Sequence, residues 1–136
     1  MKIIGFTFTK LSGEKLKDTI EDLKITTELD VPEVKEAKSP FLKIKEELLE
    51  ANFVYKVNYE PGIAKIAVEG KVLFSVDQKT ADEILKSWKK KNLPEDFRIL
   101  LFNVVMKKSA LKVLPLSDDL NLPVHIPLPA LRKNKE

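Results

Sequence analysis

The sequence contains no cysteine, which excludes a disulfide framework, thiolate nucleophiles and cysteine-ligated metal sites. Histidine is nearly absent as well: the only one, His125, stands between Val124 and Ile126 and is interpreted as a structural or surface residue. The four glycines form neither a phosphate-binding loop nor a dinucleotide fingerprint. No serine occupies a strand-to-helix elbow. We therefore expect no enzyme activity, no cofactor and no metal site.

Long apolar runs are also missing. The N-terminus alternates apolar and small polar residues, unlike a signal peptide, and no segment approaches the roughly 20 apolar residues of a membrane span. Together with the lack of cysteine, this indicates a cytoplasmic protein without membrane insertion. The length of 136 residues suits a single domain over 1–136, which ends in a short charged tail at 132–136. Charged residues reach 33%, mostly Lys and Glu, a composition more common in thermophile proteins.

Positive charge is modest overall and gathers late in the chain. The formal net charge is +3, and lysines cluster at 86–91 and 107–108, with a further basic group beyond Ala130. A basic stripe is the footprint expected of a nucleic-acid-binding protein. A solvated helix face with a soluble tail explains the same lysines. That interpretation is favoured because charge runs are usually solvated surface.

The residues from Leu48 to Val76 predict a long β-hairpin. Apolar side chains occupy every second position on both arms, so each arm has one continuous apolar face. Pro61 and Gly62 between the arms are typical of a turn, since glycine accepts the positive φ that the turn requires. Gly70 interrupts the apolar face of the return arm and indicates a bulge or a close approach of another element. A hairpin alone is marginally stable, so we expect other strands and helices to cover it.

A first strand is expected before the hairpin, over Lys2–Lys10. Its residues alternate, with Ile4, Phe6 and Phe8 on one face. The other face carries Ile3, Gly5, Thr7 and Thr9. Residues 11–15 contain serine and glycine and are predicted to form a turn that ends the strand.

A second alternating strand is predicted over Leu23–Val31. Pro32 follows it and either stops the strand or confines it to a sheet edge. The stretch from Val34 to Lys45 has a proline at its centre and is interpreted as a crossing loop, with a turn of helix around Lys43–Leu49.

After the hairpin the apolar period changes from two to about four, which predicts helices. Thr80 and Glu83 form a capping box, so the first helix should begin at Ala81. Its buried stripe is predicted from the helical spacing of three side chains: Ile84, Leu85 and Trp88.

A second helix should restart at Leu93–Asp96, and its main part is predicted over Phe97–Leu111. This helix is apolar on more than one side, so we expect the sheet to cover one side and a neighbouring subunit or a ligand to cover the other. Pro115 and the later prolines predict an irregular end. Alternating apolar residues at 124, 126 and 128 indicate that this end is extended and packed.

The order of these elements resembles the SecB family of protein-export chaperones, from Ile4 to about Leu131. Residues 5–10, Gly-Phe-Thr-Phe-Thr-Lys, are similar to the family's opening strand. The hairpin resembles the family's paired central strands, and Val72–Val76 is similar to the Gly-Ile-Phe-Ser-Ile that closes the second. Phe97–Lys108 stands where the family has its long helix, and Leu122–Ile126 resembles its Leu-Ala-Pro-Val-Asn-Phe segment.

This resemblance implies an α+β fold, a four-stranded antiparallel sheet with helices packed on one face, assembled as a homotetramer that is a dimer of dimers. It also implies a holdase: family members bind unfolded or nascent polypeptides in apolar grooves, without catalysis. Such a role is linked to protein transport or to a dedicated client such as an antitoxin. The family's export members are acidic and dock the translocase motor through that charge, whereas this chain is basic and lacks their second long helix. Motor docking is therefore not implied for this chain.

The resemblance predicts a client-binding site made of apolar groove residues. A place in the core or in a subunit interface is at least as consistent with the sequence for each of them. The candidates are Phe6, Phe8, Ile25, Phe41, Leu42, Phe102 and Met106. Two alternatives stay open: an RNA-binding or ribosome-associated protein that uses the late lysines, and a structural oligomer or carrier of a small ligand.

Overall fold

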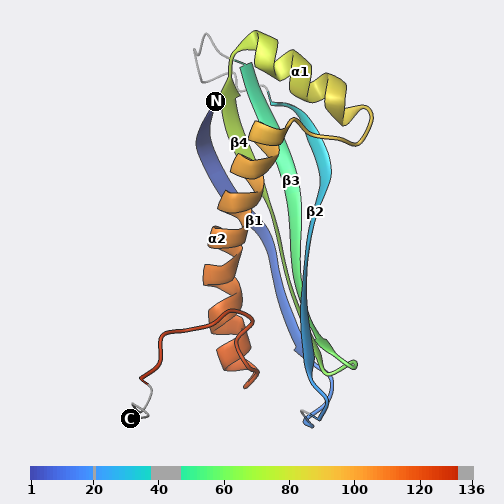
Figure 1. Ribbon diagram of the computed structural model, residues 1–136, viewed down its shortest axis with the longest axis vertical. Helices are drawn as coiled ribbons and strands as arrows, with labels where there is room; N and C mark the ends of the chain where they lie inside the picture. The colour runs from blue at the N-terminus through green and yellow to red at the C-terminus, as the bar shows by residue number, and fades with distance from the viewer. Residues whose placement is uncertain (20, 38–46, 132–136) are drawn as a thin grey trace, which may run out of the picture.

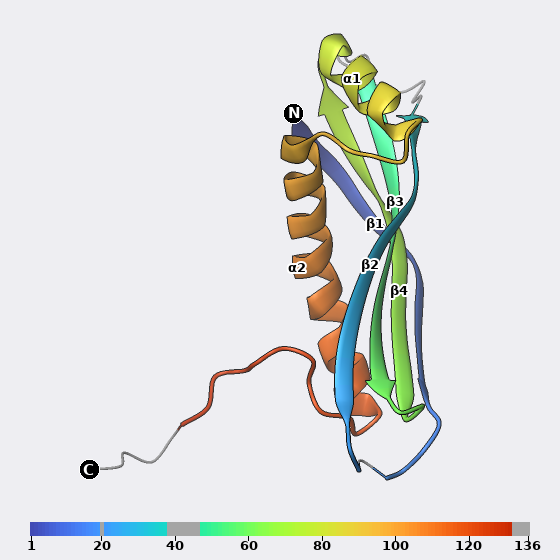
Figure 2. The same ribbon diagram turned by 45° about the vertical axis from the view of Figure 1, so that its right-hand side comes forward.

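The computed structural model describes residues 1–19, 21–37 and 47–131, and its main feature is one long antiparallel sheet (Figure 1). Its strands lie in the order β1-β4-β3-β2. Two helices follow the last strand and pack on the same face of the sheet, α1 near one end and α2 along the strands (Figure 2). The elements are β1 (Lys2–Lys15), β2 (Lys24–Ala37), β3 (Glu47–Glu60), β4 (Ala64–Val76), α1 (Gln78–Trp88) and α2 (Glu95–Asp119). The predicted fold class is confirmed.

The predicted hairpin forms the centre of this sheet. β3 and β4 pair from Glu47 with Val76 to Tyr59 with Ala64, and the apolar residues on their inner face are at most 6% exposed. Gly62 has a φ of +58°, as the turn prediction required. A Cβ on Gly70 would lie 2.8 Å from the Phe53 ring, so the predicted close approach is confirmed.

β1 is longer than predicted, and one of its residues changes face. The strand continues through residues 11–15, where a turn was expected, because β4 offers backbone partners as far as Ala64. Two register shifts interrupt the pairing, one of them between Ile3 and Gly5. The extra residue moves Ile4 out of alternation, and Ile3 instead packs against the core with Phe6. The prediction that Ile4 shares the face of the phenylalanines is wrong.

β2 is an edge strand that continues past Pro32. A register shift between Asp30 and Glu33 accommodates the proline, so the edge alternative of the prediction is the one found. The predicted loop is wrong over residues 34–37, which pair with β3 because Val34 is buried opposite Ala51. The predicted helical turn is wrong over residues 47–49, which lie in β3. The rest of both predictions, residues 38–46, lies outside the described residues.

α1 begins earlier than the capping box predicts. Its first residue is Gln78 rather than Ala81, and its N-cap is Asp77, a residue type that is favoured at this position. The predicted stripe is present: Ile84 is fully buried, and Leu85 and Trp88 are partly buried against the core.

α2 starts at Glu95, within the predicted restart, but it passes Pro115 and ends at Asp119. The irregular structure predicted from Pro115 is therefore wrong as far as residue 119. A proline inside a helix removes one backbone hydrogen bond and crowds the preceding turn. Here the buried Val113 and Ser117 pack on both sides of it, and their contacts with the sheet outweigh that cost.

The last described segment follows α2 back along the sheet and then leaves it (Figure 2). Leu122 is buried, and the Tyr59 hydroxyl donates a hydrogen bond of 2.7 Å to the Pro123 carbonyl. The His125 ring lies edge-on to Tyr55 at 6.0 Å between centroids. Leu128 is 52% exposed, so the prediction of a packed segment is wrong at that residue. The expected charged tail at 132–136 lies outside the described part of the chain.

Candidate functional site

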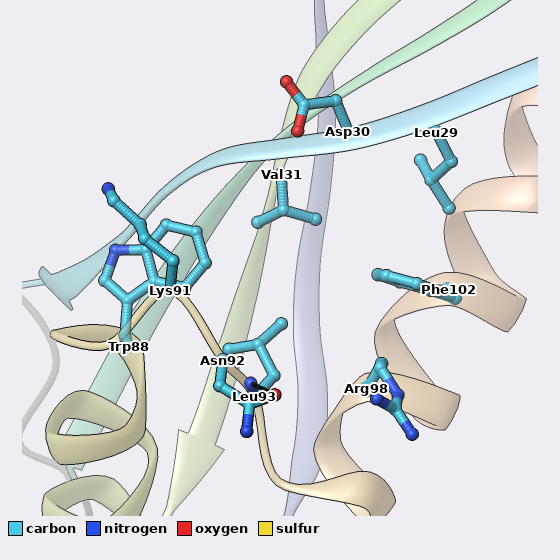
Figure 3. A pocket seen from close by; sticks show the side chains of 9 residues that line it. All are labelled: Leu29, Asp30, Val31, Trp88, Lys91, Asn92, Leu93, Arg98 and Phe102. Carbon is cyan, nitrogen blue, oxygen red and sulfur yellow. Dashed lines mark hydrogen bonds between the residues drawn. The ribbon is translucent and has the colours of Figure 1, made fainter.

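A hollow of about 350 Å³ opens where β2, the end of α1 and the first turns of α2 meet (Figure 3). We call it the Trp88 pocket. It is lined by Leu29, Asp30, Val31, Trp88, Lys91, Asn92, Leu93, Arg98 and Phe102. Leu29 and Val31 point from β2 toward the helices, while Asp30 points to the other side of the strand (Figure 3). The pocket is therefore lined by both apolar and polar side chains, and its cations come from the helical side.

The turn that ends α1 fixes two of these side chains. Lys91 has a φ of +57°, which closes the turn, and the Asn92 amide donates to the Ser87 carbonyl at 3.1 Å. The Asn92 side chain then accepts a hydrogen bond from the Leu93 amide at 3.0 Å. The Lys91 ammonium lies 4.8 Å from the centre of the Trp88 ring, a cation–π contact.

A second hollow lies on the other side of Trp88, between α1 and β2. We call it the α1 groove; its volume is about 760 Å³. It is lined by Val34, Lys35, Glu36, Asp82, Leu85, Lys86, Trp88 and Lys89. Because β2 is an edge strand, both hollows lie beside backbone that has a strand neighbour on one side only. An extended chain of another molecule can therefore reach apolar side chains and free backbone groups together.

The predicted groove residues do not form one cluster. Phe102 lines the Trp88 pocket, and Met106, one helical turn later, is 44% exposed on the same flank of α2. Phe6 and Phe8 lie in β1, at the opposite edge of the sheet, with ring centroids 5.1 and 6.0 Å from that of Phe53. Both are partly buried.

Three other predicted groove residues lie elsewhere. Ile25 is partly buried and packs against the core near the hairpin turn, with Tyr59 as its partner across the strands. Phe41 and Leu42 lie outside the described residues.

Sequence reasoning missed Trp88 as a site residue and assigned it only to the buried stripe of a helix. The available signal was that it is the only tryptophan, placed at a helix end beside lysines. Its pocket partners Leu29 and Leu93 come from other elements, and no local pattern connects them.

The opposite end of the helix-covered face is closed by the chain's own segment 122–126. Burial raises the pKa of both Tyr55 and Tyr59, and it lowers the pKa of His125. Both imidazole nitrogens of His125 are buried, and neither has a hydrogen-bond partner within the described ranges. Neutral side chains are thus favoured at this end, whereas the Trp88 pocket carries charge at its rim.

The residues that the structure describes contain no group of three or more His, Cys, Asp or Glu side chains that could hold a metal ion. Neither α1 nor α2 is long and apolar enough to cross a membrane.

Comparisons with known proteins find a similar structure but no match at sequence level. No family model matches the chain, and no curated protein matches it at sequence level. Among solved structures, the chain is similar to the SecB-like chaperone Rv1957 of Mycobacterium tuberculosis, determined in complex with a ChAD peptide from the Rv1956 HigA1 antitoxin. The match covers 98% of this chain and 92% of that one, with a TM-score of 0.50 and 14% identity. The likeness shows a SecB-like fold. At this identity it extends to the fold alone.

Proposed function

We propose that the protein is a holdase chaperone that binds unfolded or non-native polypeptides. The observation that carries the proposal is the open Trp88 pocket, which presents five apolar side chains beside an edge strand, in a SecB-like fold. A client that has no fixed shape needs accessible apolar surface and few specific polar groups. The structural neighbour binds an antitoxin peptide, which supports a dedicated client of that kind over a role in export.

Several weak apolar contacts are needed to hold a non-native chain. Burying one large apolar side chain contributes about 1.5–3 kcal/mol, and ordering an extended client costs part of that gain. We propose that Phe102 and Met106 continue the Trp88 pocket along α2. Phe6, Phe8 and Ile25 are proposed as further contacts for longer clients.

Trp88 supplies the test, because it is the only tryptophan and lies in the proposed site. A tryptophan-free client, kept unfolded, should change Trp88 emission in a saturable way. The same protein, at stoichiometric amounts, should suppress light scattering from a client diluted out of denaturant. Unchanged emission together with unchanged aggregation would contradict the proposal.

A matched pair of variants ties the binding to the pocket. Phe102→Ala should weaken client binding about tenfold, since it removes roughly 1.4 kcal/mol of apolar contact. Leu128→Ala is the control, because Leu128 is 52% exposed and lines neither hollow. Equal loss of affinity in both variants would place the client elsewhere on the protein.

We also propose that the protein assembles into a homo-oligomer, with a dimer of dimers as the expected form. Ile99 and Leu111 are 50% and 66% exposed on the outer face of α2, away from the sheet. A second subunit that packs against this side of α2 would bury both side chains.

A further inference from the structure

The two hollows beside Trp88 carry an excess of positive charge. Two cations, Lys91 and Arg98, and one acid line the Trp88 pocket, and that acid, Asp30, points away from it (Figure 3). Three lysines and two acids line the α1 groove. The apolar walls are therefore bordered mainly by cations.

Most of these cations are available to a ligand. Lys91, Arg98, Lys86 and Lys89 form no salt bridge with any residue in 1–19, 21–37 or 47–131, whereas Lys35 is paired with Glu50 at 3.5 Å. The contact recorded for the Lys91 ammonium is the Trp88 ring, which leaves its charge beside the apolar pocket. The turn at the end of α1 brings Lys91 to this side of Trp88, so its charge lies beside the pocket without a bound ligand.

We infer that the Trp88 pocket selects client segments in which a large apolar residue is flanked by Asp or Glu, with the apolar side chain between Trp88 and Phe102 and the carboxylates at Lys91 and Arg98. This inference rests on the proposed holdase function and names the client chemistry. The ion pairs form at an exposed rim, so each should change affinity only about two- to fivefold. Two pairs together give about a tenfold preference for acidic over basic flanks.

A nucleic acid is the other polyanion that such cations could bind. A polynucleotide requires an uninterrupted basic track and stacking surfaces along its backbone. Here Asp82 and Glu36 interrupt the cations of the α1 groove. The pocket offers two aromatic rings, Trp88 and Phe102, and Lys91 already lies against the first of them. A short acidic and apolar peptide therefore fits the site better than a phosphate backbone.

The test uses the full chain and three tryptophan-free peptides that share a central Phe-Leu pair. Their flanking positions carry Asp, Asn or Lys, and Trp88 emission reports binding. We expect Asp flanks to bind most tightly and Lys flanks most weakly, about tenfold apart at low salt, with the difference shrinking as salt screens the rim. Equal affinities would overturn the charge preference while leaving the holdase proposal intact.

Two double variants test whether the preference for acidic flanks arises at the Trp88 pocket. Lys91→Gln combined with Arg98→Gln should bring the affinities of the three peptides to within about twofold of one another, whatever the variant's overall affinity. Lys107→Gln combined with Lys108→Gln is the matched control, because both lysines are exposed on α2 and line neither hollow. An unchanged preference in the pocket variant would overturn the inference.

Two further outcomes are distinguishable. If no peptide binds and client aggregation is not suppressed, the holdase proposal fails and the inference fails with it. If a single-stranded oligonucleotide displaces the Asp peptide, with affinity falling steeply with the logarithm of salt, the site binds nucleic acid and the inference is overturned.

Discussion

Two serines on the buried side of α2 differ in how their hydroxyls are satisfied. Ser109 is fully buried, and its hydroxyl has no hydrogen-bond partner among the residues described. Ser117 is equally buried, but its hydroxyl donates to the Leu114 carbonyl at 2.8 Å. The serine hydroxyl should therefore lower the free energy of unfolding at position 109 and raise it at position 117.

We predict that Ser109→Ala raises the free energy of unfolding by about 1 kcal/mol, because an unsatisfied buried polar group costs about 1–3 kcal/mol and alanine favours the helix. Ser117→Ala is the control and should lower the free energy or leave it unchanged, since it breaks a formed hydrogen bond. Urea denaturation of both variants measures the difference. A Ser109→Ala protein no more stable than Ser117→Ala would contradict the prediction.

The protonation of His125 makes the stability of the C-terminal segment depend on pH. Burial lowers the pKa of its imidazole below the ordinary value of 6.5, so the folded chain binds this proton less readily than the unfolded chain. The contribution of His125 to the free energy of unfolding therefore rises with pH in this range. It is lost as the pH falls from 6.5 toward the pKa of His125 in the folded chain. The contact with Tyr55 should weaken under acid.

We predict that segment 122–126 loosens below about pH 6, seen as faster amide exchange there than in the sheet. His125→Phe keeps an aromatic ring against Tyr55 but cannot take up a proton, so it should abolish this change. Equal acceleration in the variant and the parent protein would assign the effect to other groups.

At the scale of elements, α2 shows how a sheet selects one face of a helix. Its buried residues recur every four positions: Phe97, Leu101, Val105, Ser109, Val113 and Ser117. The row continues past Pro115, which lies on the exposed side. The packing of α2 against the sheet therefore tolerates Pro115 but does not depend on it.

Replacing that proline tests this balance. Pro115→Ala should raise the free energy of unfolding by about 1–2 kcal/mol, because the roughly 3 kcal/mol helix penalty of proline outweighs its restriction of the unfolded chain. Thermal unfolding followed by circular dichroism measures the gain. Pro127→Ala, outside any helix, is the control and should change little. A Pro115→Ala protein that melts no later than the parent would show that the helix depends on the proline.

At the scale of the whole molecule, the outer face of α2 exposes apolar side chains that the sheet does not cover. The sheet covers the inner face, and the exposed Ile99 and Leu111 lie more than three turns apart on the outer one. On the opposite face of the sheet, Glu50 is paired to both Lys35 and Lys71. Self-association should therefore use the helix rather than that sheet face.

Light scattering should give the parent protein a mass of about 62 kDa, four times the 15.5 kDa of one chain. Ile99→Glu combined with Leu111→Glu should reduce this mass while the fold persists, because both positions are exposed within one chain. Thr27→Glu, at an exposed position of β2, is the control and should leave it unchanged. A monomeric parent protein would contradict the prediction.

The sequence alone determined the parts of this protein that depend on local periodicity. Alternation from Leu49 to Val76 predicted the hairpin, and a period near four predicted both helices, because each face repeats at the geometry of its own element. The fold class followed from the family resemblance that the order of these elements supports.

Tertiary structure decided where the elements end and where the candidate site lies. Gly13, Pro32 and Pro115 look like breaks locally, yet strand partners or the sheet surface carry the chain through each of them. The Trp88 pocket joins residues 29–31 to residues 88–102 through packing across the sheet. Backbone pairing and side-chain burial act between distant segments, so no local pattern could have placed these residues together.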